Sequence, residues 1–83
     1  MHGDLGDWTG RVHDDPDGTV RVEVVGPDSV PYPIARAMTR PQADALLAKI
    51  GAEALASRRP VGEVVRDAPW MAATVIMLKR QRP

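Results

Sequence analysis

The chain has 83 residues, enough for one small domain, and its eleven basic side chains balance eleven acidic ones. It contains no cysteine, which excludes disulfides, thiolate metal sites and a thiol nucleophile and fits a reducing cytoplasm. No stretch is apolar for long enough to span a membrane, and the first residues lack the pattern of a signal peptide. We therefore expect a cytoplasmic protein without membrane contact, in which residues 1–83 form one domain and the ends, 1–7 and 81–83, are flexible.

Charge is distributed unevenly along the chain. Residues 1–30 carry seven acidic and two basic side chains, whereas residues 31–83 carry four acidic and nine basic ones. The first part is therefore net −5 and the second net +5. This asymmetry has three interpretations: a basic surface that meets a partner, mutual neutralisation within the fold or a dimer, and charges that are simply solvated.

The first predicted element is a β-hairpin. Residues 8–13 and 19–25 alternate between apolar and polar side chains, as half-buried strands do. Between them, residues 14–18 read Asp-Asp-Pro-Asp-Gly, which is typical of a turn. Two registers keep the valines on one face. The register that places Arg11 opposite Glu23 is favoured, because the other sets Arg11 against Arg21.

A third extended segment follows a second turn at residues 26–29. Apolar residues at 30, 32 and 34 alternate, but prolines at 31 and 33 cannot donate hydrogen bonds to a neighbouring strand. The segment is therefore either an edge strand over residues 30–35 or an extended linker.

The remainder of the chain predicts helices. Thr39 and Gln42 have the spacing of a capping box, and apolar residues recur at helical spacing over residues 40–57. A short helix is expected over 61–67. Asp67 and Pro69 favour a further helix start, so residues 69–80 are expected to form a third helix. A strand over 74–79 is the competing interpretation, because Val75 and Ile76 are β-branched.

Few residues suggest chemistry at a site. If Gly18 occupies the glycine position of a calcium loop, His13 and Val24 fall where oxygen ligands are required, so no metal site is expected. His13 could serve as a base beside Asp14 and Asp15, but a hairpin tip is too wet to organise catalysis. The serines and threonines have no triad context. We expect no catalytic residue, no cofactor and no metal.

A basic cluster offers one function. Nucleic acid could be bound by six cations of the C-terminal part, Arg58, Arg59, Arg66, Lys79, Arg80 and Arg82. However, the pI near 6.7 is low for a nucleic-acid-binding domain, and the short helix over 61–67 offers mainly valine to a DNA groove.

The apolar C-terminal helix offers another function. Residues 70–78 are apolar almost all round, and so small a domain covers one face of such a helix better than the other. We therefore expect protein–protein contacts, with a partner or with a second copy, through Trp70, Met71, Met77 and Leu78.

Together these patterns predict an α+β fold. A β-hairpin, or a three-stranded antiparallel sheet if residues 30–35 form a strand, packs in two layers against two to three C-terminal helices. The expected function is that of a non-enzymatic interaction module, such as an adaptor, inhibitor or regulator, present as a homodimer. The alternative is a nucleic-acid-binding regulator.

Overall fold

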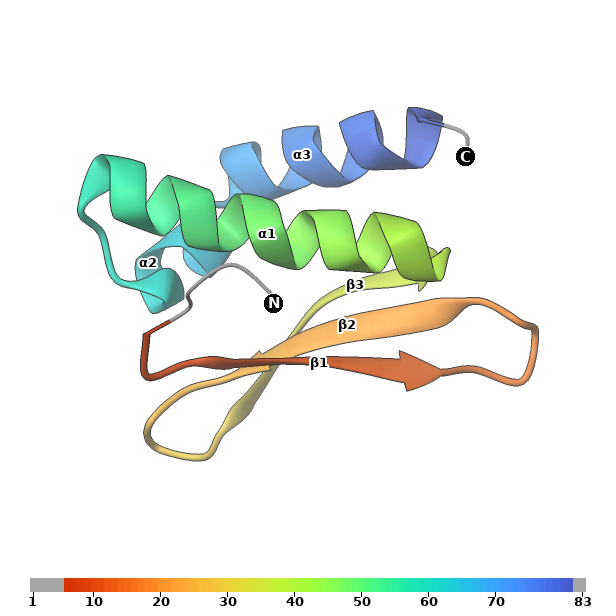
Figure 1. Cartoon of the computed structure of the whole chain (residues 1–83), viewed down its shortest axis with the longest axis horizontal. Coiled ribbons are helices and arrows are strands. Elements are labelled where there is room, and N and C mark those ends of the chain that lie inside the picture. The colour runs from red at the N-terminus through yellow and green to blue at the C-terminus, as the bar shows by residue number, and fades with distance from the viewer. Residues whose placement is uncertain (1–5, 82–83) are drawn as a thin grey trace.

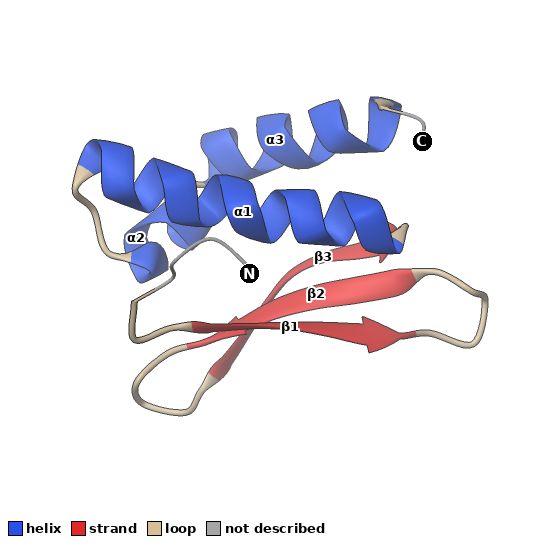
Figure 2. Ribbon diagram, in the orientation of Figure 1, coloured by secondary structure: helices blue, strands red, loops and turns tan. Residues whose placement is uncertain are grey.

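The computed structural model describes residues 6–81 and has two layers (Figure 1). Three strands, β1 (Thr9–Asp14), β2 (Val20–Val25) and β3 (Pro31–Met38), form an antiparallel sheet in the order β1-β2-β3. Three helices follow: α1 (Arg40–Ser57), α2 (Val61–Arg66) and α3 (Ala68–Arg80). All three helices lie on one side of the sheet (Figure 2). This arrangement confirms the predicted α+β fold and its third strand.

The β1–β2 hairpin has the predicted turn and register. Asp15 accepts a hydrogen bond from the N–H of Gly18 at 3.1 Å and donates its own N–H to the Thr19 carbonyl at 2.9 Å. Gly18 has a φ of 87°, which glycine adopts without strain, so the turn ends in a one-residue bulge. Arg11 lies opposite Glu23, as predicted. The Glu23 carboxylate, however, bonds the diagonal His13 ring at 2.6 Å rather than Arg11.

Strand β3 is an edge strand, not a linker, and its alternation is interrupted. Pro33 lies opposite Glu23 and Ala35 lies opposite Val22, so Ile34 is an extra residue in a bulge. A second irregularity follows at Ala37, whose φ is 59°. The simple alternation predicted over 30, 32 and 34 is therefore wrong beyond Tyr32. The second irregularity returns Met38 to the core opposite Val20.

The helix ends follow from the local sequence. At the start of α1, the Thr39 hydroxyl accepts the backbone N–H of Gln42, and the side-chain Oε1 of Gln42 accepts the backbone N–H of Thr39, which confirms the capping box. At the start of α3, the Asp67 carboxylate accepts the Trp70 N–H at 3.2 Å. Residues 74–79 are helical, so the competing strand interpretation is wrong. The cap and Pro69 start the helix upstream and it continues through the β-branched pair.

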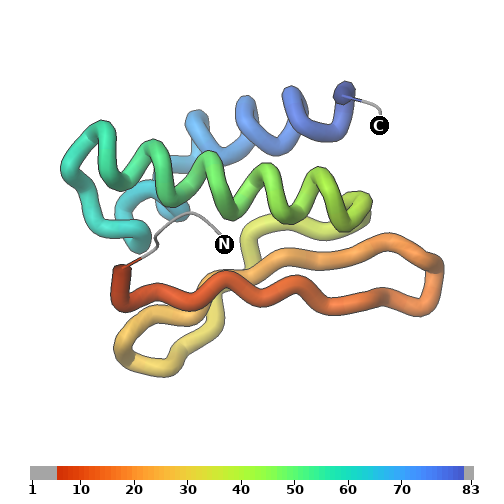
Figure 3. Tube along the Cα trace, in the orientation of Figure 1, coloured from red at the N-terminus to blue at the C-terminus, as the bar shows by residue number. Residues whose placement is uncertain are grey.

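The core lies between the sheet and the helices. Val20, Val22 and Val24 of β2 are buried, and they face buried residues of all three helices: Ala43, Leu46, Leu47, Ile50, Val61, Val64, Met71 and Leu78. The path of the chain in Figure 3 shows α1 and α3 running side by side, and their contacts place α1 over β2 and α3 against β3. Between residues 6 and 81, no helix combines the length and apolarity needed to cross a membrane.

Trp8 closes one end of this core. A methyl group added at Gly62 would lie 2.8 Å from the indole, and one added at Gly26 would lie 2.9 Å from it. The indole also stacks at a tilt on Tyr32, with ring centroids 5.7 Å apart. Two glycines therefore make room for one tryptophan between the β2–β3 turn and α2. Residues 1–5, 82 and 83, in the ends expected to be flexible, lie outside the described residues.

Candidate functional site

The four apolar residues predicted to meet a partner divide into two pairs. Met71 is 7% exposed and Leu78 is 2% exposed, so both belong to the core of the chain itself. Met77 is 41% exposed, and Trp70 is half-buried. The helical period explains the division, because Met71 and Leu78 lie two turns apart on the side of α3 that faces the core. Only Trp70 and Met77 remain within reach of a partner, so the expectation that Met71 and Leu78 make such contacts is corrected.

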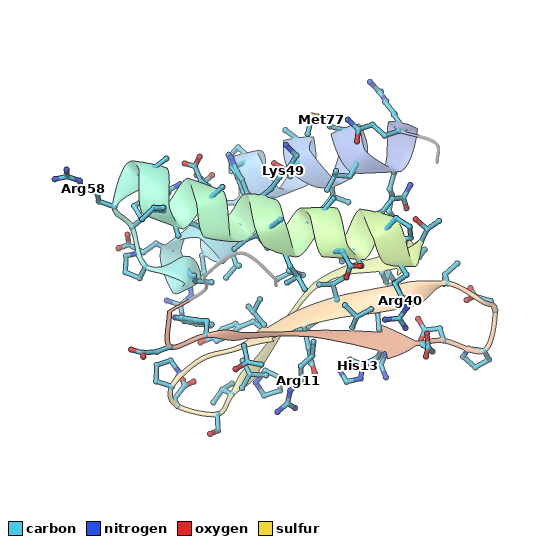
Figure 4. All side chains as sticks on the ribbon, in the orientation of Figure 1. Arg11, His13, Arg40, Lys49, Arg58 and Met77 are labelled. Carbon is cyan, nitrogen blue, oxygen red and sulfur yellow. The ribbon has the colours of Figure 1, made fainter. Side chains whose placement is uncertain are left out.

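Trp70 and Met77 line a groove between α1 and α3. This helical groove has a volume of about 370 Å³ and is lined by Lys49, Ala52, Glu53, Ala56, Trp70, Thr74 and Met77. Figure 4 shows Lys49 and Met77 on the side of the helices away from the sheet. α1 contributes alanines at 52 and 56, one turn apart, and these small side chains leave open a space that larger ones would fill.

Ile76 adds to the apolar surface of α3 outside the groove and is 51% exposed. It was not among the predicted contacts, and neither were the alanines of α1. The exposed alanines recur every four residues at 48, 52 and 56, which is a signal in the sequence for a flat helix surface. Leu55 is 82% exposed but does not line the groove.

The groove has one cation and one anion at its edge. The Lys49 ammonium group has no hydrogen bond or ion pair with another described residue. Glu53 accepts from Arg59 at 3.2 Å, and Arg59 also reaches Asp67 at 3.3 Å. Arg59 thus joins the end of α1 to the cap of α3 and fixes one end of the groove.

The six predicted nucleic-acid-binding cations do not form one patch. Arg59 is engaged by Glu53 and Asp67, and Arg66 donates to the Tyr32 hydroxyl at 2.7 Å and lies over its ring. Arg58 projects from the C-terminal end of α1, whereas Lys79 and Arg80 end α3 at the opposite end of the helical layer (Figure 4). Arg82 lies outside the described residues.

The two oppositely charged halves of the chain are joined by few contacts. In the described part of the chain, the pair between Arg40 and Asp14 at 2.7 Å is the one ion pair that links them, and both side chains are exposed. The other pairs form within one half. Neutralisation inside the fold therefore accounts for little of the charge asymmetry.

A larger hollow of about 820 Å³ lies on the face of the sheet away from the helices. It holds the His13–Glu23 pair and the pair between Arg21 and Asp15 at 3.2 Å. An imidazole that is oriented by a carboxylate can act as a general base, but it needs a nucleophile to activate. The lining contains no serine, threonine, cysteine or lysine that such a base could activate. Among residues 6–81, no group of three potential ligands could hold a metal ion.

Comparison of the chain with protein-family models, with curated proteins and with solved structures finds no match.

Proposed function

We propose that the protein is a non-enzymatic interaction module that contacts another protein through the helical groove, and that the occupant is a second copy of the chain. The observation that carries the proposal is the exposure of Met77 in the groove, with the exposed Ile76 beside it, on a helix whose opposite face already belongs to the core. An adaptor, an inhibitor or a regulator would each use such a surface. A cytoplasmic location, which the cysteine-free composition fits, is part of the same proposal.

The apolar area sets the scale of the contact. Full burial of a methionine or isoleucine side chain contributes roughly 1.5–3 kcal/mol, so covering the exposed halves of Ile76 and Met77 contributes about 2 kcal/mol per copy. A two-fold contact doubles this to about 4 kcal/mol, which corresponds to a dissociation constant of about 1 mM before association costs. Trp70 and the alanines must supply the rest, so we expect a weak dimer at micromolar to millimolar concentration.

Charge at the groove favours a second copy over an unrelated partner. Lys49 and Glu53 are one helical turn apart on α1, and they have opposite signs. A two-fold axis that sets two α1 helices antiparallel brings Lys49 of each copy towards Glu53 of the other. Such a surface is self-complementary, as a two-fold interface requires. The alanines at 52 and 56 allow the two helices to approach closely.

Sedimentation equilibrium of the full chain, with and without the Met77→Asp substitution, tests the proposal. We expect the wild-type protein to approach twice the 9.0 kDa mass of the chain as concentration rises, and the variant to remain monomeric. Circular dichroism should show that Met77→Asp leaves the fold intact, because Met77 is 41% exposed and does not belong to the core. Leu55→Asp is the matched control, since Leu55 is more exposed but lies outside the groove.

Two results would contradict the proposal. The first is a wild-type chain that stays monomeric up to millimolar concentration. The second is a dimer that Leu55→Asp disrupts as strongly as Met77→Asp does. A monomer whose groove binds an amphipathic helix of another protein would retain the interaction surface but reject the second copy as its occupant.

Nucleic-acid binding is the weaker alternative, because its cations are dispersed and two of them are engaged. It predicts that the chain retards DNA or RNA at ~50 mM salt and that neutralising Arg58 and Arg59 weakens the retardation. An absence of retardation at that salt concentration would eliminate this alternative.

A further inference from the structure

Strand β1 leaves one row of backbone groups unpaired. In an antiparallel pair, residues alternate between those that hydrogen-bond the facing strand and those that point away from it. The bond from the Asp15 N–H to the Thr19 carbonyl places Thr9, Arg11 and His13 in the bonded set. The N–H and C=O groups of Gly10, Val12 and Asp14 therefore point away from β2. β2 is the one strand that pairs with β1 in the described sheet.

The other edge of the sheet is closed. Pro31 and Pro33 of β3 have no N–H to donate, and the bulge at Ile34 and the left-handed Ala37 distort the remainder of that edge. Prolines and bulges are the usual means by which edge strands avoid pairing with another chain. β1 has neither, and its six residues form a regular strand. The fold thus protects one edge and leaves the other able to accept a strand.

Side chains on β1 indicate what that strand carries. The Arg11 side chain projects from the open face of the sheet (Figure 4), and its guanidinium has no ion pair or hydrogen bond with a described residue. Val12, on the opposite face of the strand, packs against the edge of the core. An added strand would therefore place one set of side chains beside Arg11 and His13 and the alternate set beside Val12 and α1. Acidic residues suit the first set and apolar residues the second.

A second copy fits this edge less well than an acidic chain does. Two antiparallel registers pair most of β1 with itself and keep the faces matched. One register sets Arg11 against Arg11 of the other copy, and like charges directly opposite each other destabilise a pair of strands. The other register sets Arg11 against His13, which offers Arg11 no opposite charge. An acidic side chain opposite Arg11 is favourable instead, so the edge suits an acidic chain better than a second copy.

We propose that the free edge of β1 binds an extended peptide of a partner protein in which acidic and apolar residues alternate, as a fourth strand of the sheet. Main-chain bonds to Gly10, Val12 and Asp14 provide the register, and Arg11 selects the acidic face. This mode of recognition uses a preformed edge, so the sheet needs no rearrangement. It is independent of the helical groove, which lies on the other layer.

The test uses a capped synthetic peptide that alternates glutamate and valine over the length of β1, and a second one that alternates lysine and valine. Binding to the full chain is followed by NMR at low salt. We expect the glutamate peptide to bind and to slow amide hydrogen exchange at Gly10 and Val12. Exchange at Arg11 and His13, whose amides already bond β2, should change much less. The lysine peptide should bind at least about tenfold more weakly.

Val12→Pro is the decisive variant. It removes an N–H that points away from the sheet, and an edge strand tolerates proline at such a position. The variant should bind the glutamate peptide about tenfold more weakly, because one main-chain hydrogen bond is lost. Val12→Ala is the matched control, because it loses the same packing but keeps the N–H. Arg11→Glu should reverse the preference between the two peptides. Met77→Asp should bind the glutamate peptide as the wild-type chain does, whether or not the groove forms a dimer.

Three outcomes would overturn the proposal. One is the absence of any glutamate-peptide binding at millimolar concentration by the wild-type chain. Another is equal binding by Val12→Pro and Val12→Ala, which would place the peptide elsewhere. The third is a dimer of the wild-type chain that Val12→Pro dissociates and Val12→Ala does not, which would make a second copy the occupant of the edge.

Discussion

Replacing Gln42 by glutamate tests whether the start of α1 is stabilised by its own cap alone or also by α3. A glutamate keeps the side-chain oxygen that accepts the Thr39 N–H, and glutamate serves as well as glutamine at this position of a capping box. It also adds a negative charge to the first turn, which is favourable by ~0.3–1 kcal/mol. Local rules therefore predict a free energy of unfolding equal to or greater than that of the wild-type chain.

Contacts with α3 predict the opposite. The Gln42 side-chain N–H group donates to the carbonyls of Leu78 at 3.2 Å and Gln81 at 3.3 Å. Glutamate cannot donate, so the Leu78 carbonyl loses a partly buried hydrogen bond worth about 1 kcal/mol. The new carboxylate also faces the negative end of α3, at a cost of up to ~1 kcal/mol. After the local gain is subtracted, the variant should be about 1 kcal/mol less stable, with a melting temperature lower by roughly 4–8 °C.

Urea denaturation at pH 7, followed by circular dichroism, measures the difference. Gln42→Ala, which also loses the bond to Thr39, should be destabilised further, by about 2 kcal/mol in total. The order of stability is then wild type, Gln42→Glu, Gln42→Ala. If Gln42→Glu is as stable as the wild-type chain, the bonds to α3 contribute nothing and the reasoning is wrong.

Three further predictions test the structure. Gly62→Ala places a methyl group 2.8 Å from the Trp8 ring, so it should lower the free energy of unfolding by ~1–3 kcal/mol. Urea denaturation measures the change, and an unchanged midpoint of the unfolding transition would contradict the close contact. Arg59→Ala loses two ion pairs and should cost about 1 kcal/mol in the same assay, whereas Arg58→Ala should cost little. The Thr19 hydroxyl and N–H donate to the Asp17 carboxylate and hold its pKa below the usual 3.8. The ionised Asp17 therefore stabilises the folded chain above pH 3.8, and this contribution is lost as pH falls through the lower pKa of the folded state. Asp17→Asn should therefore flatten the acid side of a plot of melting temperature against pH, and a profile that matches the wild type would exclude the effect.

Local features of the fold were predictable from the sequence. The turn at residues 14–18, the Arg11–Glu23 register and the Thr39–Gln42 cap each depend on residues that lie within one turn or one hairpin. The prolines, glycines and charged residues at those positions are compatible with few backbone conformations other than the observed ones. The strand interpretation of 74–79 failed because it weighed two β-branched residues without the cap at Asp67 that starts the helix upstream.

Features formed by distant residues were not predictable. The bulge at Ile34 depends on how β3 pairs with β2. The space occupied by the Trp8 ring depends on two glycines, at 26 and 62, that are 36 residues apart in the sequence. For the candidate site, the many apolar residues of α3 predicted a contact surface, but the sequence could not show which of those residues face the core and which face solvent. The position of α1 decides that Leu78 is covered and Met77 is not.

The two proposed surfaces lie in different layers of the fold, and this separation has a consequence for function. A dimer formed through the helical groove leaves the β1 edge of each copy free, so one dimer would present two peptide-binding edges. Binding at sites that share no residues is expected to be additive. A chain carrying both Met77→Asp and Val12→Pro should therefore lose dimerisation and peptide binding each to the extent of the single variants. A peptide affinity that falls when Met77→Asp is introduced alone would show instead that the edge is completed by the second copy.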